Sequence, residues 1–279
     1  MKIPRQMAMG AWALVLCGVA VAAADELKIH SVESPYQPGS QEIRVLLPDN
    51  DDPSRKFPVV YVLAVGQGRG SALRIFREAD LHNRYGVILA ESSFADTPWY
   101  GDHPSDPLIR QESYVRDFLV PFVEKNYSTL QSPDGRLLFG FSKSGWGALS
   151  LIFRNPDFFG YAASWDAPYF FRDFHYGMDK VFGTLEHLDR YRPDLLAVQA
   201  RSHFQSRNRL VIGGEDKWGF LIPTPSGGSH TVEMHALLLK EGIPHTYRDD
   251  LKTKHTWSAD WVVPMFEELM RISRASEGH

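Results

Sequence analysis

One short segment carries the residues best suited to nucleophilic chemistry. The apolar run 136–141 is followed by Ser142, with Gly140 before it and Gly145 after it. An apolar run that ends among small residues and continues with helical spacing predicts a strand turning sharply into a helix, with one side chain at the apex. A serine held there, beside a base and beneath backbone N–H groups, becomes a nucleophile. We therefore predict Ser142 as the nucleophile.

The turn departs from the G-x-S-x-G pattern at one position. Its fifth residue is Ser144, although Gly145 and Gly147 still provide small residues on the new helix. Ser144 is the weaker nucleophile candidate, because Trp146 stands two places after it and is too large for such a turn. The departure leaves Ser142 as the apex residue.

A base and an acid are expected after the nucleophile, each following a later strand. His255 lies between the last predicted strand and the closing helix, so we predict it as the base that takes the serine proton. The acid that orients this imidazole is predicted to be Asp216, in the turn after the strand 209–212. The open alternatives are His230 and His245 for the base, and Glu215, Asp166 and Asp250 for the acid.

Stabilising the oxyanion requires two backbone donors. One is predicted to be the N–H of Lys143, directly after the nucleophile, and the other the N–H of Val65 or Gly66, in the loop after the strand 58–65. Aromatic side chains that follow strands are expected to wall a substrate pocket. The predicted substrate-binding residues are Trp99, Tyr100, Trp165 and Asp166.

Strand-like and helix-like segments alternate along the chain and predict a mostly parallel sheet covered by helices on both faces. The first two strands, 27–32 and 41–47, are separated by a turn-rich connection and predict an antiparallel hairpin at one edge. Pro121 should bend or interrupt a helix over 114–123. The other expected strands cover 58–65, 87–90, 136–141, 161–165, 209–212 and 244–248, with further helices near 71–84, after Ser142, at 231–239 and from Trp261 onward.

Composition restricts the partners and the number of domains. The chain has 279 residues, a net charge of −4 and 43% hydrophobic residues, which is ordinary for one large globular core. Such a charge provides no basic surface for nucleic acid, so no nucleic-acid partner is expected. The scattered histidines lack metal-ligand spacing, and we predict no metal and no cofactor.

The N-terminus resembles an export signal. Lys2 and Arg5 precede an apolar stretch over 7–24 that ends in three alanines, which is typical of a cleaved signal peptide. We predict a signal peptide over 1–24, a single domain over 25–279, a secreted or periplasmic location, and no stable membrane insertion after cleavage. The only cysteine, Cys17, lies in the signal segment.

Several of these motifs resemble the esterase D group of α/β-hydrolases, which includes S-formylglutathione hydrolases and acetyl-xylan and feruloyl esterases. The resemblance covers about 58–261 and makes this chain a divergent member, because the family usually has His-Gly where this chain has Ala64-Val65, and glycine at Ser144. The similar segments are 58–63, 99–102, 112–127, 140–148 and 255–261.

The resemblance implies an α/β-hydrolase fold and a serine esterase that acts on a carboxylic ester through an acyl-enzyme on Ser142. Small-molecule esters and carbohydrate-linked esters are the expected substrates. An acyltransferase and a non-catalytic binding protein of the same fold are the alternatives, because one fold hosts many functions. Whether the aromatic segment 168–191 acts as a lid is left open by the sequence.

Overall fold

A computed structural model describes residues 27–49, 54–68, 72–214 and 222–275. In this part of the chain, one eight-stranded sheet runs in the order β1-β2-β4-β3-β5-β6-β7-β8. The strands β3 to β8 are parallel, whereas β2 pairs antiparallel with both β1 and β4. The strands are β1 Lys28–Ser34, β2 Gln37–Leu46, β3 Val59–Val62, β4 Ile88–Ser92, β5 Arg136–Phe141, β6 Tyr161–Trp165, β7 Leu210–Gly213 and β8 Thr246–Arg248.

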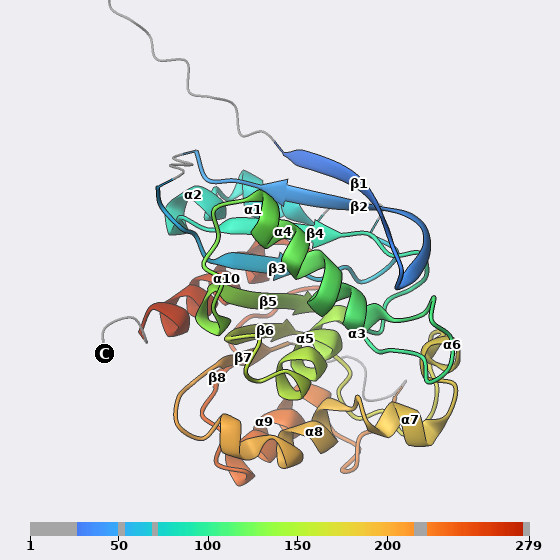
Figure 1. The fold of residues 1–279 in the computed structure, drawn as a ribbon. Coiled ribbons are helices and arrows are strands. Elements are labelled where there is room, and N and C mark those ends of the chain that lie inside the picture. Colours follow the sequence, from blue (N-terminus) through green and yellow to red (C-terminus); the bar gives the residue numbers. More distant parts are fainter. Residues whose placement is uncertain (1–26, 50–53, 69–71, 215–221, 276–279) are drawn as a thin grey trace, which may run out of the picture.

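Helices cover both faces of this sheet, with α4 and α5 on the face toward the viewer in Figure 1 and α1, α2 and α10 behind it. The α/β-hydrolase architecture expected from the sequence is confirmed. The helices are α1 Leu73–Glu78, α2 Leu81–Tyr85, α3 Gln111–Ser113, α4 Val120–Asn126, α5 Lys143–Arg154, α6 Met178–Phe182, α7 Leu185–Asp189, α8 Pro193–Gln199, α9 His230–Lys240 and α10 Ala259–Arg274.

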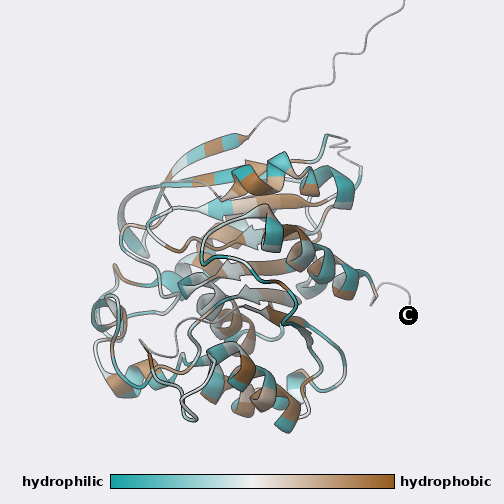
Figure 2. Cartoon of the chain, turned by 180° about the vertical axis from the view of Figure 1, so that it is seen from behind, coloured by the Kyte–Doolittle hydropathy of each residue, from teal (hydrophilic) through white to brown (hydrophobic). Residues whose placement is uncertain are grey.

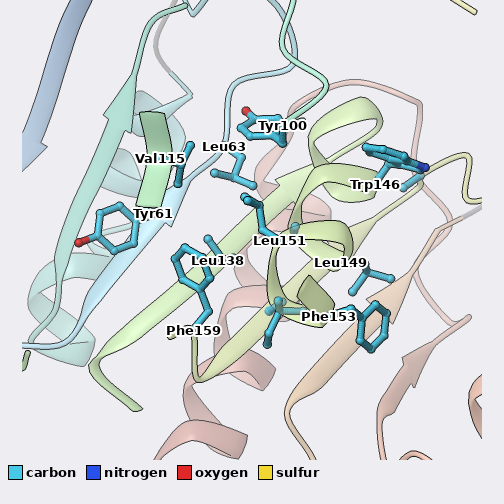
Figure 3. Packing of buried hydrophobic residues seen from close by; sticks show 14 of the residues in the cluster. Tyr61, Leu63, Tyr100, Val115, Leu138, Trp146, Leu149, Leu151, Phe153 and Phe159 are labelled. Atoms are coloured by element: carbon cyan, nitrogen blue, oxygen red, sulfur yellow. The ribbon is translucent and has the colours of Figure 1, made fainter. Parts of the chain in front are cut away.

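The central strands are apolar on both faces because side chains alternate along a strand and both faces are covered. Tyr61 and Leu138 belong to the core beneath α5, whereas Val60 and Phe139 belong to the core beneath α10. Figure 3 shows Tyr61, Leu138 and Leu151 in the first of these layers. Figure 2 shows the hydrophobic strands from behind, between helices that carry both hydrophobic and hydrophilic residues.

Two predicted helices differ in detail from those observed. The helix expected over 71–84 is divided into α1 and α2, because Asp80 adopts a left-handed conformation with φ 55°. The segment before Pro121 winds as a π-helical turn, Tyr114–Leu119, between α3 and α4. This change of winding confirms the interruption predicted at Pro121, where proline has no N–H to donate.

Among the described helices, none is both long and apolar enough to span a bilayer. The predicted signal peptide over 1–24 lies outside the described residues.

Candidate active site

The nucleophile turn has the predicted strand–turn–helix context. β5 ends at Phe141, Ser142 forms the apex, and α5 begins at Lys143. Ser142 has φ 55° and ψ −125°, a conformation that a residue with a side chain rarely adopts and that costs about 1–3 kcal/mol. Packing of the surrounding residues must hold Ser142 in this strained conformation. Ser142 is closely surrounded, with only 4% of its surface exposed.

Two glycines permit the close approach of strand and helix. A Cβ on Gly140 would lie 2.1 Å from the carbonyl oxygen of Ser144, and one on Gly145 would lie 2.8 Å from Ser164 Oγ on β6. Ser144, the residue that departs from the pattern, uses its hydroxyl to hold the turn. Its Oγ accepts from the N–H of Phe141 and donates to the carbonyl of Phe141, both at 2.9 Å.

Ser142, His255 and Asp166 form one hydrogen-bonded chain. His255 Nε2 lies 3.1 Å from Ser142 Oγ, and His255 Nδ1 lies 2.6 Å from Asp166 Oδ2. With the proton on Nδ1, the imidazole donates to the carboxylate and leaves Nε2 free to accept the serine proton. Phe141 packs on the His255 ring at a centroid distance of 4.5 Å and limits its movement. His255 therefore lies between the serine hydroxyl and the carboxylate, with one ring nitrogen toward each.

The carboxylate contact expected from Asp216 is made by Asp166, while Asp216 itself lies outside the described residues. Asp166 directly follows β6 and is 3% exposed. Its N–H donates to the carbonyl of Gly213 on β7 at 2.7 Å. A Cβ on Gly214 would lie 2.6 Å from the Asp166 Cα, so the glycine leaves the space that Asp166 occupies. The glycine-rich end of β7 thus positions an acid supplied by β6.

The alternative candidates within the described residues have other partners. The buried His230 ring contacts the N–H of Phe170 at 3.2 Å and the carbonyl of Ile222 at 2.8 Å. His245 is hydrogen-bonded to His235 at 2.7 Å, and Asp250 accepts from the Arg248 guanidinium. Glu215 lies outside the described residues.

The loop predicted to carry the second oxyanion donor lies beside the nucleophile strand. β3 and β5 are parallel, with Val62 opposite Phe139. The residues after Val62 therefore lie beyond the carboxyl ends of the strands, as Ser142 does. The hydroxyl of Tyr100 donates to the carbonyl of Ala64 at 2.6 Å and fixes the start of this loop. Val65 is partly exposed and Gly66 is exposed, as a surface that meets a substrate requires.

Three aromatic residues predicted to bind substrate lie in the core instead. Trp99 and Tyr100 are 0% exposed and Trp165 is 1% exposed. Trp99 packs edge-on against Trp146, and Trp165 stacks on Trp261 with ring centroids 5.5 Å apart. Trp99 and Tyr100 therefore pack in the core next to the site. Local sequence cannot tell such buried aromatic residues from residues that line a pocket.

A cavity of ≈ 350 Å³ opens at the loop after β3, which is predicted to carry the second oxyanion donor. Most of its wall could not be predicted from local sequence, because the contributing residues come from separated segments. Glu91 at the end of β4 is 1% exposed, and its carboxylate accepts from the N–H of Ala72 at 3.2 Å. The lining residues are Ala64, Val65, Gly66, Gln67, Gly68, Ala72, Arg74, Ile75, Glu91 and Trp257.

The segment 168–191 is largely packed against the body of the protein. Tyr169 and Phe171 are fully buried, and α6 and α7 contribute Phe182 and Leu188 to the core. The Trp99 indole N–H donates to the carbonyl of Tyr176 at 3.2 Å. This segment forms a wall in the described conformation.

Curated relatives cover only part of the chain. Esterase Rv1288 from Mycobacterium tuberculosis strain H37Rv and Esterase MT1326 from strain CDC 1551 are each 30% identical over 139 residues. The alignment covers 48% of this chain and 30% of each relative, so the chain matches under a third of their length.

Solved structures share the fold over nearly the whole chain at low identity. A ferulic acid esterase is 16% identical with a TM-score of 0.69, covering 90% of this chain and 98% of its own. An S-formylglutathione hydrolase from Agrobacterium tumefaciens is 15% identical with a TM-score of 0.71, covering 88% and 94%. The fluorophosphonate-binding serine hydrolase FphF from Staphylococcus aureus is 14% identical with a TM-score of 0.71, covering 89% and 98%.

A family model matches residues 34–272, which include β2 to β8 and all three residues of the hydrogen-bonded chain. The chain belongs to this family, described as "Putative esterase".

Proposed function

We propose that this protein hydrolyses carboxylic esters through an acyl-enzyme on Ser142. The observation that carries the proposal is the contact sequence from Ser142 Oγ to His255 Nε2 at 3.1 Å, and from His255 Nδ1 to Asp166 Oδ2 at 2.6 Å. Membership of an esterase family supports it independently.

In the first half-reaction, His255 accepts the Ser142 proton as Oγ attacks the ester carbonyl carbon. The carbonyl oxygen becomes an oxyanion, stabilised by the Lys143 N–H and by a donor from Val65 or Gly66. The tetrahedral intermediate then collapses. The bond to the alcohol oxygen breaks, and His255 gives its proton to the departing alcohol.

In the second half-reaction, His255 accepts a proton from water as the water oxygen attacks the acyl-enzyme. Collapse of this second intermediate returns the proton to Ser142 and releases the carboxylic acid. Asp166 keeps the His255 proton on Nδ1 and stabilises the imidazolium in both steps, and its burial excludes competing water.

Among carboxylic esters, carbohydrate-linked esters are part of the proposal, and the fold shared with a ferulic acid esterase supports it.

We also propose that the protein is exported. Lys2, Arg5 and the apolar stretch that follows them support this proposal. N-terminal sequencing of protein exported by a bacterial host tests the location. The expected product begins after Ala22 or Ala24, and a product that retains Met1 contradicts cleavage.

Hydrolysis of p-nitrophenyl acetate and butyrate tests the reaction. We expect turnover by the wild type and a loss of about a thousandfold or more in Ser142→Ala and His255→Ala. Ser206→Ala and His203→Ala, which alter exposed residues, are the matched controls. An inert wild type contradicts the proposal, as does a Ser142→Ala variant as active as the wild type.

A further inference from the structure

The side chain of Lys143 presents an unusual charge at the nucleophile. Lys143 directly follows Ser142 and is partly buried, with its Nζ over the Trp99 ring, 5.7 Å from the centroid. Trp99 is fixed on its other sides by Trp146 and Phe171. Lys143 is the first residue of α5, so its side chain leaves the backbone at the residue next to the reacting serine.

Within the described residues, Lys143 has no carboxylate partner and donates no hydrogen bond from Nζ; its recorded contact is with the Trp99 ring. Burial lowers the pKa of its ammonium. Two other cations of low exposure have carboxylate partners. Arg136 contacts Glu124 at 2.6 Å, and Arg192 contacts Asp194 at the same distance.

Within the described part of the chain, this partly desolvated ammonium has lost water without gaining an anion, which is unfavourable. The face of the Trp99 ring attracts the ammonium, but this uncharged ring does not neutralise it. The position does offer an explanation, because any ester that reaches Ser142 must lie against the first turn of α5. An anionic group on that ester would supply the missing partner.

We propose that Lys143 selects esters that carry an anionic group, such as a carboxylate, a phosphate or a sulfate, and binds that group through its ammonium. This inference rests on the proposed ester hydrolysis and specifies its substrate class. The backbone N–H of Lys143 stabilises the oxyanion, while its side chain recognises the charge. The anionic group can belong to the acyl part or to the alcohol part, and the experiment distinguishes the two.

Two matched substrate pairs test the proposal. The acyl pair is p-nitrophenyl hexanoate and mono-p-nitrophenyl adipate, in which a carboxylate replaces the terminal methyl group. The alcohol pair is 4-carboxyphenyl acetate and its methyl ester. The quantity measured is the ratio of kcat/KM for the anionic member to kcat/KM for the neutral member of each pair.

In at least one pair, Lys143→Met should lower this ratio by about 10- to 100-fold, the effect of removing a hydrogen bond to a charged group. Lys143→Arg should keep most of the ratio, because the charge remains. Lys125→Met, which removes one exposed lysine from α4, should leave it unchanged. In the wild type, the ratio should fall with rising salt, because salt screens the attraction between the ammonium and the anionic group. This measurement does not depend on the folding of any variant.

Equal ratios in wild type and Lys143→Met for both pairs overturn the inference, as does a wild-type ratio insensitive to salt. The neutral esters report separately on the proposed function. If the wild type hydrolyses the neutral esters in a Ser142-dependent manner, but neither Lys143→Met nor salt changes the ratios, only the proposed role of Lys143 is wrong. If the wild type hydrolyses no member of either pair, both proposals fall.

Discussion

Asp166 is held for His255 by backbone contacts from the adjacent strand. It adopts φ 49°, which an aspartate tolerates better than most residues, and its N–H is bonded to the Gly213 carbonyl. Gly214 leaves room for its backbone. These constraints orient the carboxylate toward Nδ1 before any substrate binds, which is what an acid of a catalytic triad requires.

The two carboxylates that could serve His255 are distinguished by mutation. Asp166→Asn should lower kcat by about 10³- to 10⁴-fold, because an amide favours the wrong imidazole tautomer and cannot stabilise its cation. Asp216→Asn should lower kcat by a much smaller factor. The measurement is kcat for p-nitrophenyl acetate, and the reverse order of the two losses would assign the acid to Asp216.

Lys143 should also lower the stability of the protein. Burial lowers its pKa in the folded state, so below that pKa the buried charge destabilises the fold. As pH rises toward the ordinary lysine pKa of about 10.4, the unfolded chain holds more protons than the folded protein and this penalty disappears.

Lys143→Met should therefore raise Tm at pH 7.5, and the difference should shrink at pH 10. Thermal unfolding followed by circular dichroism at the two pH values measures this. A variant that melts below the wild type at pH 7.5 would show that the lysine stabilises the protein.

At the scale of elements, Tyr100 joins three parts of the site. Its hydroxyl is bonded to Ala64 at the start of the oxyanion loop. Its ring occupies the space beside Gly147 of α5, where a Cβ would lie 2.2 Å from Cδ2. Figure 3 shows Tyr100 near Leu63, above the strands. The loop after β4 therefore links α5 to the loop after β3.

Tyr100→Phe should lower kcat for p-nitrophenyl acetate by about 10-fold, since the Ala64 carbonyl loses its donor and the following N–H groups become less well positioned. Tyr61→Phe is the matched control. The Tyr61 hydroxyl is buried without a hydrogen-bond partner in the described part of the chain, and its removal should leave kcat unaltered. Equal kcat values in the two variants would remove Tyr100 from the mechanism.

Most elements could be predicted from the sequence, because apolar runs and helical spacing are local patterns. The strand before Ser142, the helix after it and the early hairpin are confirmed. The acid could not be chosen this way, since Asp166 and Asp216 each follow a strand, and only packing decides which carboxylate reaches His255. The burial of Trp99 is likewise a tertiary property, set by Trp146 and Phe171.

The parallel sheet brings distant residues together at the carboxyl ends of its strands. Ser142 and His255 are 113 residues apart in sequence, and they meet because each follows a strand whose carboxyl end lies on this side of the sheet. Arg209, 5% exposed, ties together the segments that lead into β6 and β7. Its guanidinium donates to four backbone carbonyls, of Pro156, Phe159, Gly160 and His203.

Arg209→Met should lower the free energy of unfolding by about 3 kcal/mol or more, because buried carbonyls lose a charged donor. Arg201→Met removes a more exposed guanidinium, 3.8 Å from Glu241, and should cost at most about 1 kcal/mol. Urea unfolding of both variants measures the difference. Similar losses would show that the Arg209 contacts contribute little.

Mass spectrometry of the protein after reaction with a fluorophosphonate tests the nucleophile most directly. One adduct is expected, on the peptide that contains Ser142. The adduct should be absent from Ser142→Ala and should form much more slowly in His255→Ala, because the base is then missing. Labelling at another residue, or ester hydrolysis that continues in Ser142→Ala without an adduct, would contradict a nucleophile at Ser142.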